Sequence, residues 1–393
     1  MDFFQMSYYR INKRLLYYLG QWPLQTPGER HFYRSTTILL VGSIVVPKLI
    51  KFAECLGNLD GMIRCLPVLG IHARSTARFL NCIINAKTLT NRIKYDWNAN
   101  SANIEVTILR RYAERGRLLT IIYTAYMALA LGMYLSLPII PAILDIVLPL
   151  NQSRDRIYLY ETEYFVDRDE NYVYLTIHAC MTMPFSVGMI VAYDTMFAVY
   201  VHHACAIFAT LGARLETLGG ISFADHRSET DEAAPKRGDE TYDKIVNCIK
   251  IHKEAVEFTS LIEASGYICY FFVVGIDMLA MTLTGFMTVT NLNRPGEALR
   301  HGAFAIGEVV HLFYVCWQGH VLMEHSQHIF INAYNINWYD ISARAKRLVI
   351  VIMMRSAEPC KLTAGKIYVL SMENFATALK TSMSYFTVLL SMQ

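Results

Sequence analysis

Long apolar stretches, each separated from the next by a polar segment, form the main pattern of the sequence. A helix that crosses a bilayer needs about 20 consecutive, mostly apolar residues. Seven stretches approach or exceed that length, and the predicted spans are 35–56, 62–86, 118–148, 172–210, 262–289, 298–322 and 371–393. The pattern therefore predicts an all-α membrane protein with seven transmembrane helices.

The predicted spans divide the chain into four parts. Basic residues and an apolar face in the first part predict an N-terminal arm with a short amphipathic helix at the membrane surface. The second part holds six spans and a flexible loop at 213–250, in which 225–240 is expected to be disordered. The third part is amphipathic and too charged to span, and the fourth re-enters the membrane and contains the last span. In chain order, the first to fourth parts are 1–34, 35–322, 323–358 and 359–393.

The last predicted span is too polar for contact with lipid alone. One helical stripe carries mostly polar side chains, namely Asn374, Thr377, Thr381, Ser384, Val388 and Ser391. Larger apolar residues lie away from that stripe, namely Phe375, Leu379, Met383, Phe386 and Leu390. Two structures fit this pattern. Either several copies of the helix surround a water-filled pore, or the hydroxyl groups bond to neighbouring helices inside a bundle.

Composition agrees with a membrane protein and narrows its function. Of the 393 residues, 54% are hydrophobic and only 18% are charged, and the mean hydropathy of +0.27 is high for a soluble protein of this size. The net charge of +3 and the absence of a long basic run argue against a nucleic-acid partner. No GxSxG, HExxH or phosphate-loop motif occurs, so the sequence predicts neither an enzyme nor a cofactor.

The charges of the connecting segments predict the orientation. Arginine and lysine crowd the N-terminal arm, the segment 87–117 and the region after the sixth span, which places these parts in the cytoplasm. The loop 149–171 is acidic and contains Asn151 in a glycosylation sequon, which places it outside. The N-terminus is therefore predicted inside and the C-terminus outside. A G-protein-coupled receptor has the opposite orientation, and its DRY-like and NPxxY motifs are absent from the expected spans.

Several ionisable side chains fall inside the predicted spans, where a charge needs a partner. They are His178, Asp194, His202, His203, Asp277, Glu308 and His311. Two interpretations stay open, internal hydrogen bonds that hold the helices together or a functional site. Glu324, His325 and His328 have a helical spacing compatible with a metal site. Neither a cysteine nor a second carboxylate completes that set, so no metal is predicted.

The C-terminal part of the chain resembles the signature of insect odorant receptors. The resemblance is carried by HSQHIFINAY at 325–334, NWY at 337–339, LTAGK at 362–366, LKTS at 379–382 and SYFT at 384–387. Outside 319–393 the chain is similar in length, number of spans and orientation. The resemblance implies an odorant-gated, non-selective cation channel subunit in the plasma membrane of sensory neurons. It also implies a heterotetramer with a co-receptor subunit and a central pore lined by the last helix.

The resemblance also implies site residues. The family's Tyr-Phe-x-Val-Leu pattern matches 385–389, so Val388 is the candidate gate, and ordinary packing is the alternative role of this residue. The candidate pore residues are Thr377, Thr381, Ser384, Tyr385, Val388 and Ser391. The region 323–358 corresponds to the family's cytoplasmic anchor, in which subunits touch. Its candidate contacts, expected on a buried face with Ile329 and Ala333, are Phe330, Tyr334, Trp338 and Tyr339.

A small apolar odorant is expected to bind in the outer half of the bundle, between the second, third, fourth and sixth spans. The candidate ligand-binding residues are Met62, Leu66, Leu69, Tyr126, Met127, Ala130, Tyr134, Tyr174, His178, Met181, Thr182 and Phe185. For each of them, packing between helices is the alternative role. Two other functions also stay open, a G-protein-coupled chemoreceptor and a multi-pass membrane enzyme that uses His178 or His311.

Overall fold

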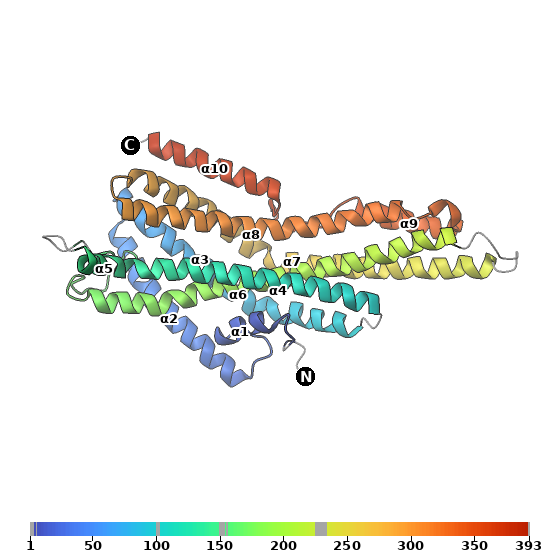
Figure 1. Ribbon diagram of the computed structural model, residues 1–393, viewed down its shortest axis with the longest axis horizontal. Helices are drawn as coiled ribbons and strands as arrows, with labels where there is room; N and C mark the ends of the chain where they lie inside the picture. Colours follow the sequence, from blue (N-terminus) through green and yellow to red (C-terminus); the bar gives the residue numbers. More distant parts are fainter. Residues whose placement is uncertain are drawn as a thin grey trace.

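The chain folds into an elongated bundle of long helices (Figure 1). The structure is a computed structural model, and it describes residues 4, 6–99, 103–148, 154, 156–224 and 234–391. Its helices are α1 (Arg10–Tyr18), α2 (Pro27–Glu54), α3 (Leu59–Ala99), α4 (Asn103–Ser136), α5 (Ile140–Val147), α6 (Tyr172–Ala224), α7 (Ala234–Thr290), α8 (Pro295–Tyr334), α9 (Ala343–Ser356) and α10 (Met372–Ser391). Two short 3₁₀ helices, η2 (Leu137–Ile139) and η4 (Trp338–Asp340), and two short strands, β1 (Thr363–Ala364) and β2 (Tyr368–Val369), complete the described elements.

The seven predicted spans correspond to α2, α3, α4 with α5, α6, α7, α8 and α10. Four helical stretches are both long and apolar enough to cross a membrane by composition, namely Pro27–Glu54, Ile104–Ile139, Tyr172–Leu218 and Glu240–Thr290. Helices α3 and α8 are not among these four, and both carry ionisable side chains near the middle of their predicted spans. These side chains are paired inside the bundle, as described below.

Proline shapes the end of the third span. Pro138 lies in η2 and Pro141 lies in the first turn of α5. Proline has no backbone N–H and clashes with the preceding turn, so a regular helix does not continue through such a pair. The span therefore ends as α4, a 3₁₀ turn and a separate short helix (Figure 1).

Helices α6 and α7 are much longer than a bilayer requires. The 53 residues of α6 extend about 80 Å at about 1.5 Å per residue, against a hydrocarbon core of about 30 Å. The predicted fourth span, 172–210, is likewise longer than the roughly 20 residues that a crossing needs. Residues 213–224 and 234–250, predicted as part of a flexible loop, are instead helical. Lysine and glutamate have a high helix propensity in water, so a polar sequence alone does not end a helix. Residues 225–233 lie outside the described part of the chain.

The N-terminal arm is part of the protein core. Helix α1 forms where the sequence predicts a short amphipathic helix, but its apolar side packs on α4 and α6 instead of on lipid. Leu16, Leu19 and Trp22 are buried in the same cluster as residues of α6. Asn12 donates a hydrogen bond to Thr120 on α4 at 3.2 Å. The arm therefore holds α4 and α6 together from one side.

Helix α10 lies at the edge of the bundle, where it contacts α7 and α8 (Figure 1). The strands β1 and β2 pair antiparallel just before it. Gly365, in the turn between them, has a φ of +65° and donates its N–H to the Tyr267 carbonyl on α7 at 2.8 Å. A side chain at Gly319 on α8 would lie 2.6 Å from Leu370 Cβ, so glycine permits close packing there. The hairpin thus fixes the start of α10 against both helices.

Candidate functional site

A network of buried ionisable side chains lies in the middle of the bundle. Arg74 on α3 donates from Nη1 to Asp277 on α7 and to Glu308 on α8. Its Nη2 donates to Glu308 Oε1 at 2.7 Å. All three side chains are at least 95% buried. A guanidinium group presents several donors in one plane, which suits it to holding two carboxylates at once.

Arg78, one turn further along α3, extends the network. Its Nη1 lies 2.9 Å from Asp194 Oδ2 on α6, and its Nη2 lies 2.7 Å from His311 Nε2 on α8. Tyr123 on α4 donates to the same Asp194 oxygen at 2.8 Å. Residues four apart lie on one face of a helix, so Arg74 and Arg78 point into the same interior. Five helices, α3, α4, α6, α7 and α8, meet in this network.

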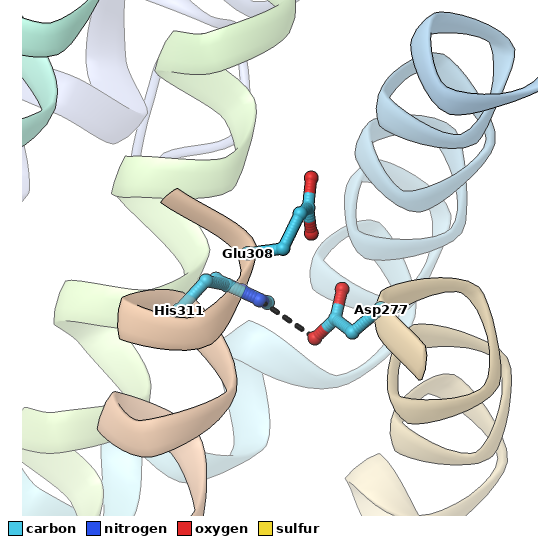
Figure 2. Close-up of side chains that lie close together, drawn as sticks. All are labelled: Asp277, Glu308 and His311. Atoms are coloured by element: carbon cyan, nitrogen blue, oxygen red, sulfur yellow. Dashed lines mark hydrogen bonds and ion pairs between the residues drawn. The ribbon is translucent and has the colours of Figure 1, made fainter. Parts of the chain in front are cut away.

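Asp277, Glu308 and His311 are arranged closely enough to suggest a metal site (Figure 2). Each offers a ligand atom, and these atoms lie within 4.8 Å of one another. His311 Nδ1, however, lies 2.7 Å from Asp277 Oδ2, and the Arg74 guanidinium contacts both carboxylates. The other ring nitrogen, Nε2, faces the Arg78 guanidinium at 2.7 Å, so neither nitrogen of His311 is free to bind a metal. Arg74 is therefore the cation at this position.

The network confirms the interpretation of Asp194, Asp277, Glu308 and His311 as internally bonded groups. The sequence analysis did not identify their partners, Arg74 and Arg78, which lie inside the second predicted span. Their spacing of four residues was the signal, because it places two positive charges on one helix face opposite three acidic residues of other spans.

A second polar group lies among α2, α3 and α6. Lys48 Nζ lies 2.7 Å from His72 Nε2 and 3.5 Å from the centre of the Tyr160 ring. The other ring nitrogen of His72 lies 3.0 Å from the Ser186 hydroxyl. Lys48 is thus buried against a neutral acceptor and an aromatic face, not exposed to lipid as a snorkelling side chain would be.

A cavity lies on the same side of the network as this polar group. Its volume is about 40 Å³, and residues of α3, α4, α7, α8 and the loop before α6 line it. Tyr134 donates to the Leu159 carbonyl at its wall, and Arg300 donates to the Tyr158 carbonyl at 2.9 Å. The lining includes Pro67, Val68, Tyr134, Tyr160, Thr284 and Phe304.

The structure brings some of the candidate ligand-binding residues close to this interior. Tyr134 lines the cavity. Met127 packs against Tyr123, and Thr182 is fully buried with its hydroxyl bonded to the His178 carbonyl. Met62, Leu69, Tyr126, Ala130 and Phe185 are half-buried, and none of them lines the cavity.

Four candidate ligand-binding residues lie elsewhere. Tyr174 and Met181 are 74% and 60% exposed, because they share a face of α6 that lies about 80–100° around the axis from Thr182. Leu66 packs with α7 and α10 in the cluster that contains Leu283 and Phe386. The ring of His178 is bonded to Ser43 at 2.9 Å and to Tyr164 at 2.8 Å. These positions do not converge on the cavity.

Helix α10 has one buried face and one exposed face. Ala378 and Ser382 are buried against the bundle, and the Ser382 hydroxyl lies 3.3 Å from the Met278 carbonyl on α7. The polar stripe is on the other face, where Val388 is 52% exposed. Thr377, Ser384, Tyr385 and Ser391 are exposed as well, and Thr381 is half-buried. The stripe is thus directed away from its own chain.

The candidate residues of the anchor region lie on two faces. Ile329 and Ala333 are buried in the main core. The four candidate subunit contacts, Phe330, Tyr334, Trp338 and Tyr339, are all exposed on the single chain. Residues 329 and 333 share a helix face, whereas 330 and 334 lie about 100° around the axis. Four large apolar side chains are therefore left without cover from their own chain, and their role as subunit contacts stays a prediction.

His325, part of the set first compared with a metal site, has other partners. Its Nδ1 lies 2.8 Å from the Val321 carbonyl, and its Nε2 lies 2.8 Å from the Tyr112 hydroxyl. Since a carbonyl only accepts, Nδ1 carries the proton and Nε2 accepts from the tyrosine. Burial also lowers the pKa of His325. Asn151, the predicted glycosylation site, lies outside the described residues.

The long helices and the paired charges inside them define a multi-pass helical membrane protein. The chain matches the profile of the 7tm odorant receptor family over residues 59–383. This match covers most of the sequence, so the chain belongs to the odorant receptor family, whose members are seven-helix receptors and not enzymes.

Individual relatives support the family assignment. Odorant receptor 13a of Drosophila melanogaster is 22% identical over 409 residues, which cover 95% of this chain and 92% of that receptor. Odorant receptor Or2 of Anopheles gambiae is 23% identical over 218 residues, 55% of this chain and 54% of that receptor. The match to odorant receptor 10 of Aedes albopictus spans 39% of that protein. The chain therefore spans about half or less of these last two relatives.

A co-receptor and a solved structure complete the comparison. The odorant receptor coreceptor of Harpegnathos saltator is 24% identical over 149 residues, 37% of this chain and 30% of the co-receptor. The structure of olfactory receptor OR5 from Machilis hrabei in complex with eugenol has a TM-score of 0.75 and 16% identity, and the alignment covers 98% of this chain and 97% of that one. This likeness establishes the seven-helix fold.

Replacing Arg74 tests the importance of the network. Arg74→Met would leave Asp277 and Glu308 buried without their guanidinium, which costs about 3–5 kcal/mol. We expect the thermal unfolding midpoint of the purified chain to fall by roughly 10 °C. Lys94→Met, an exposed change on the same helix, should leave it nearly unchanged. Adding Asp277→Asn and Glu308→Gln to Arg74→Met should recover part of the loss. Equal midpoints for Arg74→Met and Lys94→Met would contradict the pairing.

Proposed function

We propose that the chain is a subunit of an odorant-gated, non-selective cation channel. The observation that carries this proposal is the exposed polar stripe on α10, from Thr377 to Ser391. A transmembrane helix with hydroxyl groups on a face that its own chain leaves open needs water or another subunit there. A ring of such helices around an axis supplies both, since neighbours cover the flanks and water fills the centre.

The gate in this proposal is Val388. A ring of aliphatic side chains closes a pore because it offers water no hydrogen bonds, and it opens when the ring widens enough to become wet. Val388 is on the exposed face, between Ser384 and Ser391. This placement supports a pore position over packing inside the chain. Thr377 and Thr381 donate to carbonyls of their own helix, at 3.1 and 2.9 Å, and the oxygen of each hydroxyl can still accept a hydrogen bond from water.

The proposed ligand is a small apolar molecule that binds in the outer half of the bundle, near the cavity beside Tyr134. A molecule that buries about 250 Å² of apolar surface gains about 6 kcal/mol, which corresponds to a Kd of tens of micromolar. A cavity of about 40 Å³ holds little more than a water molecule. Ligand entry therefore requires the side chains around the cavity to move.

Helix α7 connects the cavity to the pore helix. Thr284 lines the cavity. At the next residue, Gly285, a side chain would lie 3.5 Å from Phe386 on α10. The two sites thus contact different faces of one turn of α7, about 100° apart around its axis. A ligand that displaces this turn changes the position of Phe386, two residues from the gate, and it favours the open state to the extent that it binds that state more tightly.

The assembly in this proposal is a heterotetramer with an odorant co-receptor in the plasma membrane of sensory neurons. Similarity to co-receptor sequences supports such a partner. The N-terminus is inside, and the exposed aromatic side chains of the anchor region, Phe330, Tyr334, Trp338 and Tyr339, are the proposed contacts between subunits. Large apolar side chains exposed together on one chain are typical of an interface.

Electrical recording tests this function directly. Cells that express the chain with a co-receptor should respond to an odorant panel with an inward cation current that begins without a second messenger. Cells that express the co-receptor alone should not respond to the same odorants. An odorant-evoked second messenger without current, together with an N-terminal tag accessible on intact cells, would instead support a G-protein-coupled receptor.

Substitution of Val388 tests the gate. Val388→Ala shortens the side chains that form the apolar constriction. The closed pore is then wider, so we expect current before odorant is added. Val388→Gln should alter conduction because it introduces a polar group into the ring. Met383→Ala is the matched control, since Met383 is 59% exposed on another side of α10. If both Val388 variants conduct like the parent, Val388 does not lie at the constriction.

A further inference from the structure

We propose that a basic groove between α7, α9 and the β1–β2 hairpin binds the phosphorylated headgroup of an anionic phospholipid from the cytoplasmic leaflet. The groove has a volume of about 620 Å³. Its walls carry three basic side chains, Arg355, Lys361 and Lys366. The headgroup class is an inositol phosphate lipid, because its several phosphates match three cations within one groove.

The charges of the groove are not neutralised by the chain itself. Among the residues that the structure describes, no ion pair joins Arg355, Lys361 or Lys366 to a carboxylate. Arg355 donates to the Glu358 carbonyl at 3.1 Å, and that bond leaves its positive charge in place. Glu263, the one acidic side chain of the lining, already accepts hydrogen bonds from the backbone N–H and the hydroxyl of Thr363. Three positive charges against one engaged carboxylate favour an anion.

The hairpin holds Lys366 in position. Gly365 and Lys366 have φ values of +65° and +63°, so the backbone turns sharply at this point. The turn places Lys366 Nζ 5.1 Å from the centre of the Tyr267 ring on α7. The hydroxyl group of Ser260 lies on the α7 wall and provides an additional donor, whereas that of Thr259 already donates to the Ala255 carbonyl at 2.9 Å. The groove is therefore a shaped site, not only a set of mobile lysines.

The surroundings of the groove suit a lipid better than a soluble anion. Large apolar side chains on its outer side are exposed, namely Ile268, Phe271, Phe272 and Ile367. Tyr267 lies where the fifth predicted span begins, so the groove is at the boundary between water and hydrocarbon. A lipid places its phosphates in the groove and its acyl chains against these apolar residues. The assignment of this boundary to the cytoplasmic side rests on the orientation given in the proposed function.

The groove also joins two parts that move relative to each other in a gated channel. Arg355 belongs to the end of α9, and Lys361 and Lys366 belong to the link that leads into α10. A bound headgroup ties these parts to α7. Lipid occupancy would thus stabilise one position of the pore helix.

Lipid binding to the purified complex of the full chain with its co-receptor tests this proposal. The probe is a fluorescent short-chain phosphatidylinositol 4,5-bisphosphate, titrated in nanodiscs of phosphatidylcholine and read by anisotropy. The groove variant is Lys361→Gln with Lys366→Gln. The control is Lys253→Gln with Lys346→Gln, which removes the same charge outside the groove, where Lys253 pairs with Glu257 and Lys346 bonds the Tyr339 carbonyl. We expect the groove variant to weaken binding about 30-fold and the control to change it less than about 3-fold.

Three outcomes would contradict this proposal. Equal weakening by both double variants would overturn the groove as the site, because it would indicate general attraction to the membrane surface. Soluble inositol trisphosphate that binds as tightly as the lipid would overturn the assignment to a lipid. Unchanged binding in the groove variant would overturn the proposal altogether. Since the titration needs neither odorant nor current, failure of the proposed channel function would not be mistaken for failure of this site.

Discussion

The pairing of Arg74 and Arg78 with acidic side chains is the constraint on which the rest of the bundle depends. An unpaired charge inside a bilayer costs several kcal/mol, so α3 can cross the membrane only where other helices supply carboxylates. Asp194, Asp277 and Glu308 come from α6, α7 and α8, and Tyr123 adds α4. The network therefore fixes which helices are neighbours and at what depth they meet. Apolar packing alone would not specify depth, because lipid and leucine are equally apolar.

The same constraint explains why α10 is different from the other helices. No side chain of α10 takes part in the central network, and α10 packs on α7 and α8 at the edge of the bundle. Its contacts are mostly apolar, with a few hydrogen bonds such as that of Ser382 to α7. A helix held this way can shift without breaking buried ion pairs. The ion-paired core is thus a rigid frame, and α10 is the helix that can shift relative to it.

Much of the fold could be predicted from the sequence because the relevant signals are local. The lengths of the hydrophobic stretches predicted all seven spans, each of which corresponds to a helix or, for the third span, to α4 with α5. The stripe on α10 was also predictable, since Thr377, Thr381 and Ser384 follow the helical period. The partners of Asp277 and Glu308 were not predicted, because a pairing between spans depends on which helices are neighbours. Sequence periodicity contains no information about that.

The exposure of individual ligand and anchor candidates could not be predicted, for one physical reason. The sequence shows which residues share a helix face, but it does not show how the helix is rotated within the bundle. Met181 and Thr182 are adjacent in sequence, yet one is exposed and the other is fully buried. Ile329 is in the core of its own chain, whereas the next residue, Phe330, is exposed on that chain. At helix ends, the charged residues after Leu211 suggested a loop, but they continue α6 in water.

Substituted-cysteine accessibility along α10 tests most directly whether its exposed stripe faces a water-filled pore. Single cysteines would be placed at Thr381, Ser384, Val388 and Ser391, and at the buried positions Ala378 and Ser382, in the full chain expressed with its co-receptor. A charged thiol reagent applied during odorant should change the current at the stripe positions and leave the buried positions unaffected. Equal modification of both faces, or modification of neither, would contradict a pore-lining α10.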